Sequence, residues 1–259
     1  MDVAKEEIVK TEELETRYER YKGILKDLTI MSDVFMRNVF KKRECTEYVL
    51  QVIMNKKVII GNFKMNLLPN EVVLYIENLK KDIESNNEIV LCVPYVDIPY
   101  ASNIVNDTNL YVGAQNMYSK EEGAYTGEIS VKMLKSIKTD YVLLGHYERR
   151  LYFNETEEEI NKKLILALKY NIKPIVCIGS NESLENEINM ILKDIKKESI
   201  NNIIFIYEPV FSIGTGNALY KNEIIDKIKL IQNIICEKYG EKFNNLTLGY
   251  GGRINSNNV

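Results

Sequence analysis

The sequence of 259 residues contains a single histidine, His146, and this scarcity excludes whole classes of site. Catalysis by a pair of imidazoles and a metal site built from several histidines are both impossible. Cysteines are few as well, and they lie far apart without a CxxC or CxH pairing: Cys45, Cys92, Cys177 and Cys236. Two of them fall within apolar, strand-like runs. This spacing favours reduced, buried thiols of an intracellular protein over disulfides or a metal site.

Long apolar runs and a strong charge of one sign are also missing. No stretch approaches the about 18 consecutive apolar residues of a membrane span. Residues 1–28 lack the apolar core of a signal peptide and are too acidic for a typical transit peptide. The net charge of -3 gives no electrostatic reason to expect a nucleic acid or an anionic membrane as partner. We expect a soluble, cytoplasmic protein, with a plastid or another organelle as the alternative location.

From Lys57 onward, short β-branched runs alternate with amphipathic, helix-like stretches. The runs are apolar throughout, as expected for parallel strands buried on both faces. They lie at 57–61, 89–93, 110–113, 141–144, 174–178, 203–206 and 246–249, and the helical stretches include 71–85, 157–170, 182–197 and 221–239. This repeated alternation predicts an α/β fold, either a doubly wound sheet or a (β/α)₈ barrel.

Residues 1–56 differ from the rest of the chain. Glu, Lys and Arg dominate there, proline is absent, and apolar residues recur at helical spacing: Ile24, Leu25, Leu28, Met31, Val34 and Phe35. We predict a helical N-terminal extension over 1–56, packed on the main domain or on a partner, and a barrel-like domain over 57–259. Only seven strands are visible before Val259, so the sheet is either open or a barrel without its eighth strand and last helices. An unclosed barrel would expose two strand edges.

Polar residues follow several of the predicted strands. Functional residues of parallel α/β folds gather at the carboxyl ends of the strands. Asn62 and Lys64 follow the first run, His146 follows the fourth, and Glu208 follows the sixth. Taken singly, each has an ordinary structural explanation, since Lys64 could be a solvated charge and Glu208 the capped end of a strand. Their shared position at one end of successive strands favours a common site.

The residue types at these strand ends suit proton transfer next to a carbonyl. A carboxylate can take a carbon-bound proton, and an imidazole and an ammonium can stabilise the oxygen that becomes negative. Glycines follow the sixth and seventh runs, and their backbone N–H groups could hold a phosphate. The pattern therefore predicts an acid–base enzyme that acts on a small anionic substrate.

Six motifs in order resemble the triosephosphate isomerase family. They are GNFKMN, GAQN followed by GAYTGE, GHYERR, CIG, YEPVFSIGTG and YGG, and they run from about Lys57 to the end of the chain. The resemblance implies a (β/α)₈ barrel, usually a homodimer. It also implies interconversion of dihydroxyacetone phosphate and D-glyceraldehyde 3-phosphate in glycolysis and gluconeogenesis, with neither cofactor nor metal.

The resemblance also implies a role for each matching residue. Glu208 would be the base that moves the proton between two carbons, and His146 the neutral electrophile. Lys64 would supply positive charge, Asn62 would hold a substrate oxygen, and Glu148 would be the carboxylate beside Lys64. The family is a standard example of a carboxylate base, a neutral histidine and a closing loop.

Further roles fall on the loops. Thr126 would reach across a dimer interface, and the N–H of Gly214, with Gly252 and Arg253, would bind the substrate phosphate. The lid over that phosphate would comprise Pro209, Val210, Phe211, Ser212, Ile213, Gly214, Thr215 and Gly216.

The chain departs from the family pattern at several of these positions. Phe63 and Phe211 replace tryptophans, Tyr147 replaces a smaller serine, and Arg253 replaces a serine that latches the lid. From these departures and the missing eighth strand, the alternative prediction is a truncated, catalytically impaired family member that acts, if at all, through association with a partner.

Overall fold

The computed structural model describes residues 29–31, 58–82, 87–106, 108–179, 183–209, 220–243 and 246–251. Eight parallel strands in these residues form a closed barrel in which neighbours in sequence are neighbours in space. The strands are β1 (Thr29–Met31), β2 (Val58–Asn62), β3 (Glu88–Val93), β4 (Leu110–Ala114), β5 (Tyr141–Leu144), β6 (Lys173–Ile178), β7 (Ile204–Tyr207) and β8 (Thr247–Tyr250). The predicted fold class, a (β/α)₈ barrel with seven strands after residue 57, is confirmed.

The strand β1 departs from two predictions. Residues 29–31 fall where the apolar spacing predicts a helix, but they form a strand that pairs in parallel with both β2 and β8. Ile30 lies opposite Ile59 on one side and Tyr250 on the other. The expected pair of exposed edges is therefore wrong, because β1 occupies the place between β8 and β2. The remainder of the predicted helical extension lies outside the described residues.

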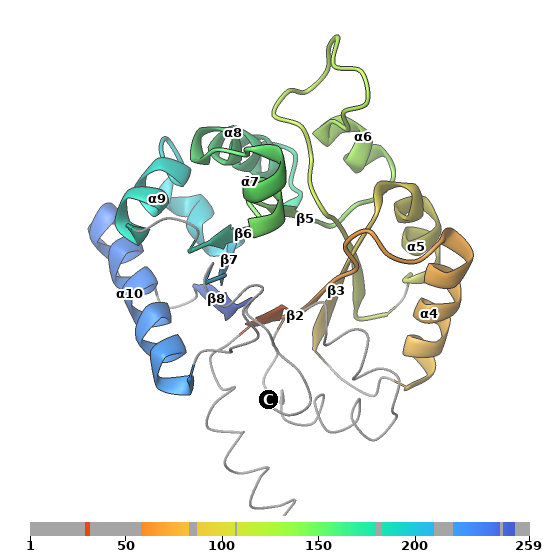
Figure 1. The fold of residues 1–259 in the computed structure, drawn as a ribbon, viewed down its shortest axis with the longest axis horizontal. Helices are drawn as coiled ribbons and strands as arrows, with labels where there is room; N and C mark the ends of the chain where they lie inside the picture. The colour runs from red at the N-terminus through yellow and green to blue at the C-terminus, as the bar shows by residue number, and fades with distance from the viewer. Residues whose placement is uncertain are drawn as a thin grey trace, which may run out of the picture.

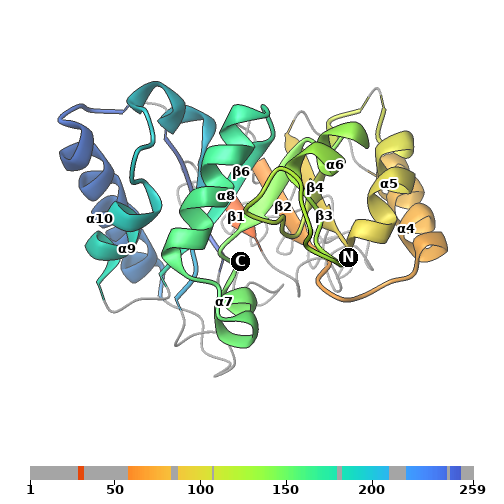
Figure 2. The same cartoon turned by 90° about the horizontal axis from the view of Figure 1, so that it is seen from above.

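Helices cover the strands from both sides and from above in Figure 1, which looks along the molecule's shortest axis. Figure 2 places α4 and α5 at one end of the molecule and α9 and α10 at the other. The α-helices are α4 (Pro69–Asp82), α5 (Ile98–Ile104), α6 (Val131–Ser136), α7 (Tyr147–Phe153), α8 (Glu157–Lys169), α9 (Leu184–Ile191) and α10 (Lys221–Tyr239), with 3₁₀ turns η1 (Tyr95–Asp97) and η2 (Lys197–Asn202). No helix within the described residues is long and apolar enough to cross a membrane.

The apolar side chains form two layers, one on each side of the strands. The inner layer consists of strand residues alone and fills the barrel interior: Ile60, Val90, Cys92, Tyr141, Leu143, Ile175, Cys177, Ile204 and Ile206. The outer layer joins the alternate strand residues, such as Val142 and Leu144, to buried helix residues, such as Leu164 and Ile188. Because both faces of each strand are buried, the apolar runs of the sequence are uninterrupted rather than alternating.

Candidate active site

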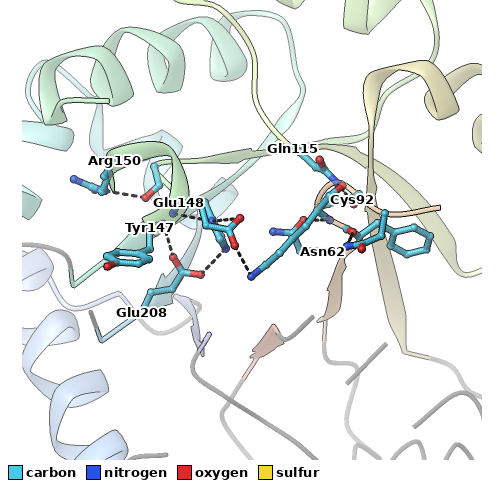
Figure 3. Close-up of polar contacts among 12 residues, drawn as sticks. Asn62, Cys92, Gln115, Tyr147, Glu148, Arg150 and Glu208 are labelled. Atoms are coloured by element: carbon cyan, nitrogen blue, oxygen red, sulfur yellow. Dashed lines mark hydrogen bonds and ion pairs between the residues drawn. The ribbon is translucent and has the colours of Figure 1, made fainter. Parts of the chain in front are cut away.

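The structure brings four predicted site residues to the carboxyl ends of three strands. Asn62 and Lys64 lie at the end of β2, His146 follows β5, and Glu208 follows β7. The Lys64 Nζ lies 2.8 Å from Oε1 of Glu148, and Nε2 of His146 lies 3.4 Å from Oε1 of Glu208. Figure 3 shows Glu148 and Glu208 pointing into the same space, with Asn62 on the facing side.

The start of α7 fixes the imidazole of His146. This residue is the N-cap of the helix, and its Nδ1 accepts a hydrogen bond from the backbone N–H of Glu148 at 3.2 Å. In a neutral imidazole that accepts an N–H at Nδ1, the ring proton lies on Nε2. That N–H faces the Glu208 carboxylate, and the side chain is 9% exposed.

Glu208 is a buried carboxylate with both oxygens directed at the β5–α7 turn. Its Oε2 accepts the backbone N–H of Tyr147 at 3.1 Å, while Oε1 faces His146 (Figure 3). Its own backbone N–H donates to the carbonyl of Ile178 at 2.7 Å, which ties the end of β7 to that of β6. The carboxylate, 4% exposed, therefore lies beside Nε2 of the imidazole and away from bulk water.

The thiol of Cys177 lies beside this carboxylate. Burial, and secondarily the negative charge of Glu208, raise the pKa of Cys177 well above its ordinary value. The thiol therefore stays protonated and does not act as a nucleophile at neutral pH. The sequence-based prediction of a buried, reduced thiol agrees with the burial of Cys177.

Lys64 occupies a left-handed backbone conformation with φ of 51°. Its N–H donates to Oδ1 of Asn62 at 2.9 Å, and its carbonyl accepts from Nε2 of Gln115 at 2.9 Å. The same Gln115 amide donates to the carbonyl of Cys92 at 3.0 Å (Figure 3). A non-glycine residue adopts this conformation only where its surroundings enforce it, so these bonds aim the ammonium into the site. Sequence reasoning missed Gln115, although it lies within the GAQN motif.

The remaining predicted residues are more dispersed. Thr126 is exposed in the long loop after β4, which projects from the barrel in Figure 1. Pro209 is buried next to Glu208. The lid residues 210–216, including Gly214, and the phosphate residues Gly252 and Arg253 lie outside the described residues. In the described part of the chain, no group of three or more His, Cys, Asp or Glu side chains could hold a metal ion.

Comparison with known proteins gives a consistent match. Residues 57–259 match the family model described as triosephosphate isomerase. The chain is 42% identical over 220 residues to the triosephosphate isomerase of Alkaliphilus oremlandii, covering 80% of this chain and 88% of the relative. It is 39% identical over 218 residues to that of Caldanaerobacter subterraneus subsp. tengcongensis, with the same coverage. The Clostridium tetani enzyme is 37% identical over 218 residues, covering 80% of this chain and 86% of the relative.

Proposed function

Because the chain belongs to the triosephosphate isomerase family, we propose that it interconverts dihydroxyacetone phosphate and D-glyceraldehyde 3-phosphate by proton transfer through an enediolate. Family membership makes the chain an enzyme with a glycolytic role. The observation that carries the proposed mechanism is the proximity of a buried carboxylate, Glu208, to the imidazole of His146, whose Nε2 lies 3.4 Å from Oε1 of Glu208.

In the forward reaction, the Glu208 carboxylate removes a proton from C1 of dihydroxyacetone phosphate. The electron pair of the broken C–H bond forms the C1–C2 double bond, and negative charge develops on the C2 oxygen. His146 donates its Nε2 proton to that oxygen and recovers a proton from the C1 hydroxyl. Glu208 then returns its proton to C2, which leaves an aldehyde at C1. The net change moves one proton between carbons and one between oxygens.

Lys64 and Asn62 act on the oxygens rather than on the carbons. The ammonium stabilises negative charge as it develops on the substrate, and it is held ready by Oε1 of Glu148 at 2.8 Å. Asn62 is 5% exposed, so its amide is positioned by packing, and it also orients the backbone of Lys64. The proposal further assigns the lid to Pro209–Gly216 and phosphate binding to Gly214, Gly252 and Arg253.

A homodimer and a cytoplasmic location are part of the proposal. The face that carries the ends of β2 and β5 exposes several large apolar side chains, which is typical of a protein interface. The exposed residues are Met65, Leu67, Leu68, Leu151, Tyr152 and Phe153. Thr126, exposed in the projecting loop, would contact the second subunit. The alternative of a truncated, impaired family member rests on the departures at Tyr147, Phe211 and Arg253 as well as on an open barrel, and the pairing of β1 with β2 and β8 counts against the open barrel alone.

A coupled assay tests the proposed reaction. The protein is purified from a host that lacks its own isomerase and is supplied with dihydroxyacetone phosphate, NAD and a dehydrogenase that consumes the aldehyde. We expect turnover, and we expect Glu208→Gln to lower kcat by about 10³-fold because the general base is lost. Glu241→Gln, at an exposed position, is the matched control and should behave as the unmodified chain. Equal rates for the unmodified chain and Glu208→Gln would refute the proposal.

A further inference from the structure

An arginine whose side chain is 9% exposed contacts two strand ends at once. Arg150, in α7, donates from Nε to the carbonyl of Gly145 at 2.8 Å and from Nη2 to the carbonyl of Cys177 at 3.2 Å. Nη1 donates to Oε1 of Glu157 at 2.9 Å, and Nη2 also donates to Oε1 of Glu187 at 2.8 Å. Figure 3 shows Arg150 on the opposite side of Glu148 from Asn62. This guanidinium therefore links the end of β5 to the end of β6.

Glu187 completes the link from the outer layer of helices. It is fully buried in α9, and its second oxygen, Oε2, accepts the backbone N–H of Gly179 at 3.0 Å. The start of α9 is fixed because the Oγ of Ser183 accepts the N–H of Asn186 at 3.3 Å. One carboxylate thus holds both the guanidinium and the residue that follows β6.

Arg150 and Glu187 hold the backbone of Gly145 and Gly179, which lie next to His146 and close to Glu208. Gly145 directly precedes His146 and has a left-handed φ of 70°. Gly179 directly follows Ile178, whose carbonyl accepts the N–H of Glu208 at 2.7 Å. A shift of Glu187 would therefore reach the imidazole through Arg150 and Gly145, and the carboxylate through Gly179 and Ile178.

Stability alone is a weak reason for this buried ion pair. Removing two charges from water costs several kcal/mol, and apolar residues of similar size often serve a fold as well. Its contacts with the backbone on both sides of the reactive pair suit a different role. We propose that Glu187, acting with Arg150, is a positioning residue that sets the distance between Nε2 of His146 and the Glu208 carboxylate. This proposal rests on the proposed isomerase function.

Three variants of α9 test the proposal. Glu187→Ala removes both hydrogen-bonded oxygens, whereas Glu187→Gln keeps an acceptor for Gly179 and removes the charge. Glu185→Gln is the matched control, because Glu185 is exposed on the same helix. Misplacing reacting groups by about 1 Å costs on the order of 10²-fold in rate, so we expect kcat of Glu187→Ala to fall by about 30- to 100-fold. We expect a smaller loss for Glu187→Gln and none for Glu185→Gln.

The split between kcat and KM separates positioning from a merely structural role. KM for dihydroxyacetone phosphate and the affinity for inorganic phosphate should both stay within about twofold in Glu187→Ala, since phosphate does not contact the carboxylate–imidazole pair. Rates are expressed per folded molecule, with the folded fraction taken from thermal unfolding. An unchanged kcat per folded molecule, with only a lower Tm, would overturn the proposal. If Glu187→Ala does not fold, the same criterion applies to Glu187→Gln.

The single histidine provides a readout that does not depend on turnover. In ¹⁵N-labelled protein, one imidazole gives one set of ring resonances, and they report the tautomer and surroundings of His146. We expect these resonances to shift in Glu187→Ala and to stay in place in Glu185→Gln. If no variant turns over substrate, the proposed function fails, while the resonances still decide the positioning role. Identical spectra in all variants would reject it.

Discussion

Two arcs of the barrel differ in how firmly they are held. From β5 to β7, neighbouring strands pair along their length, from Tyr141 to Leu144 and from Ile204 to Tyr207. Arg150 and Glu187 reinforce this arc from the helix side. From β8 through β1 to β2, pairing depends on the three-residue strand β1. In this strand, only Ile30 has a register partner in both neighbouring strands. The first arc carries His146 and Glu208, the pair proposed to transfer protons, and the second carries Asn62 and Lys64.

The placing of these residues in different arcs matches how steeply proton transfer and charge attraction depend on distance. Proton transfer fails with displacements of about 1 Å, so its two groups need the firmly held arc. The attraction between an ammonium and a developing negative charge declines only as the inverse of distance, so Lys64 tolerates more movement. The four predictions that follow test this comparison.

The largest expected effect is the loss of the Lys64 charge. Lys64→Met should lower kcat/KM by about 10²- to 10³-fold, because a charge aimed at the developing oxyanion is removed. The free energy of unfolding should change little, since the Lys64–Glu148 pair is 23% and 36% exposed at its two side chains. Steady-state kinetics and urea unfolding give the two quantities. Lys197→Met, which removes a remote, exposed ion pair with Glu241, is the control for both. The division between the arcs would be contradicted if Lys64→Met lowered the free energy of unfolding by as much as it raised the activation free energy that corresponds to kcat/KM.

A proline in β1 addresses the weaker arc. Ile30→Pro removes a backbone N–H from the middle of the strand and should destabilise the protein by about 1–3 kcal/mol. Ile30→Val keeps that N–H and is the matched control. Hydrogen exchange should accelerate first at the amides of β2 and β8, while the amides of β5 to β7 stay protected. Equal acceleration in both arcs would show that the arcs unfold as one unit, against the comparison.

The smallest effect concerns the interior thiols. Burial raises the pKa of Cys92 to about 12, and that of Cys177 is also raised well above the ordinary value. These thiols stay neutral in the folded chain and ionise near pH 9 in the unfolded one. Their contribution to stability is thus complete below pH 9 and declines as the pH rises from 9 towards the folded-state values. We expect a loss of about 1 kcal/mol per thiol between pH 8 and pH 10, measured by urea unfolding.

Alkylation at pH 8 compares the thiols individually. The half-buried Cys236 should react with iodoacetamide before Cys92, and Cys177, on β6 in the firmly held arc, should react last. Peptide mass mapping over time gives the order. Reaction of Cys177 ahead of Cys236 would mean that the arc from β5 to β7 opens more readily than its pairing implies.

The sequence predicted the elements that depend on local pattern. The seven apolar runs are strands, and the helical stretch 221–239 corresponds to α10 at Lys221–Tyr239. The strand-end rule predicts Asn62, Lys64, His146 and Glu208 at one rim, and the structure has them at the carboxyl ends of β2, β5 and β7. These agreements arise because uninterrupted apolar runs and strand-end positions are set by residues adjacent in the chain.

What the sequence could not predict depends on distant partners. The strand β1 lies among residues with helical spacing, and only its pairing with β2 and β8 makes it a strand. Glu187 occurs in a charged, amphipathic stretch where a carboxylate is ordinarily solvated, and only the approach of Arg150 and Gly179 shows that it is buried. The predicted helix 182–197 ends at Ile191, and its remainder includes the start of η2.

The place of β1 has a consequence for chain order. A closed barrel determines which strands are neighbours and leaves open which of them comes first. Among the described strands, the one that bears the first family motif, β2, is second, and β1 ahead of it pairs with β8. Strand β2, which ends at Asn62, therefore has a parallel neighbour on each side, β1 and β3.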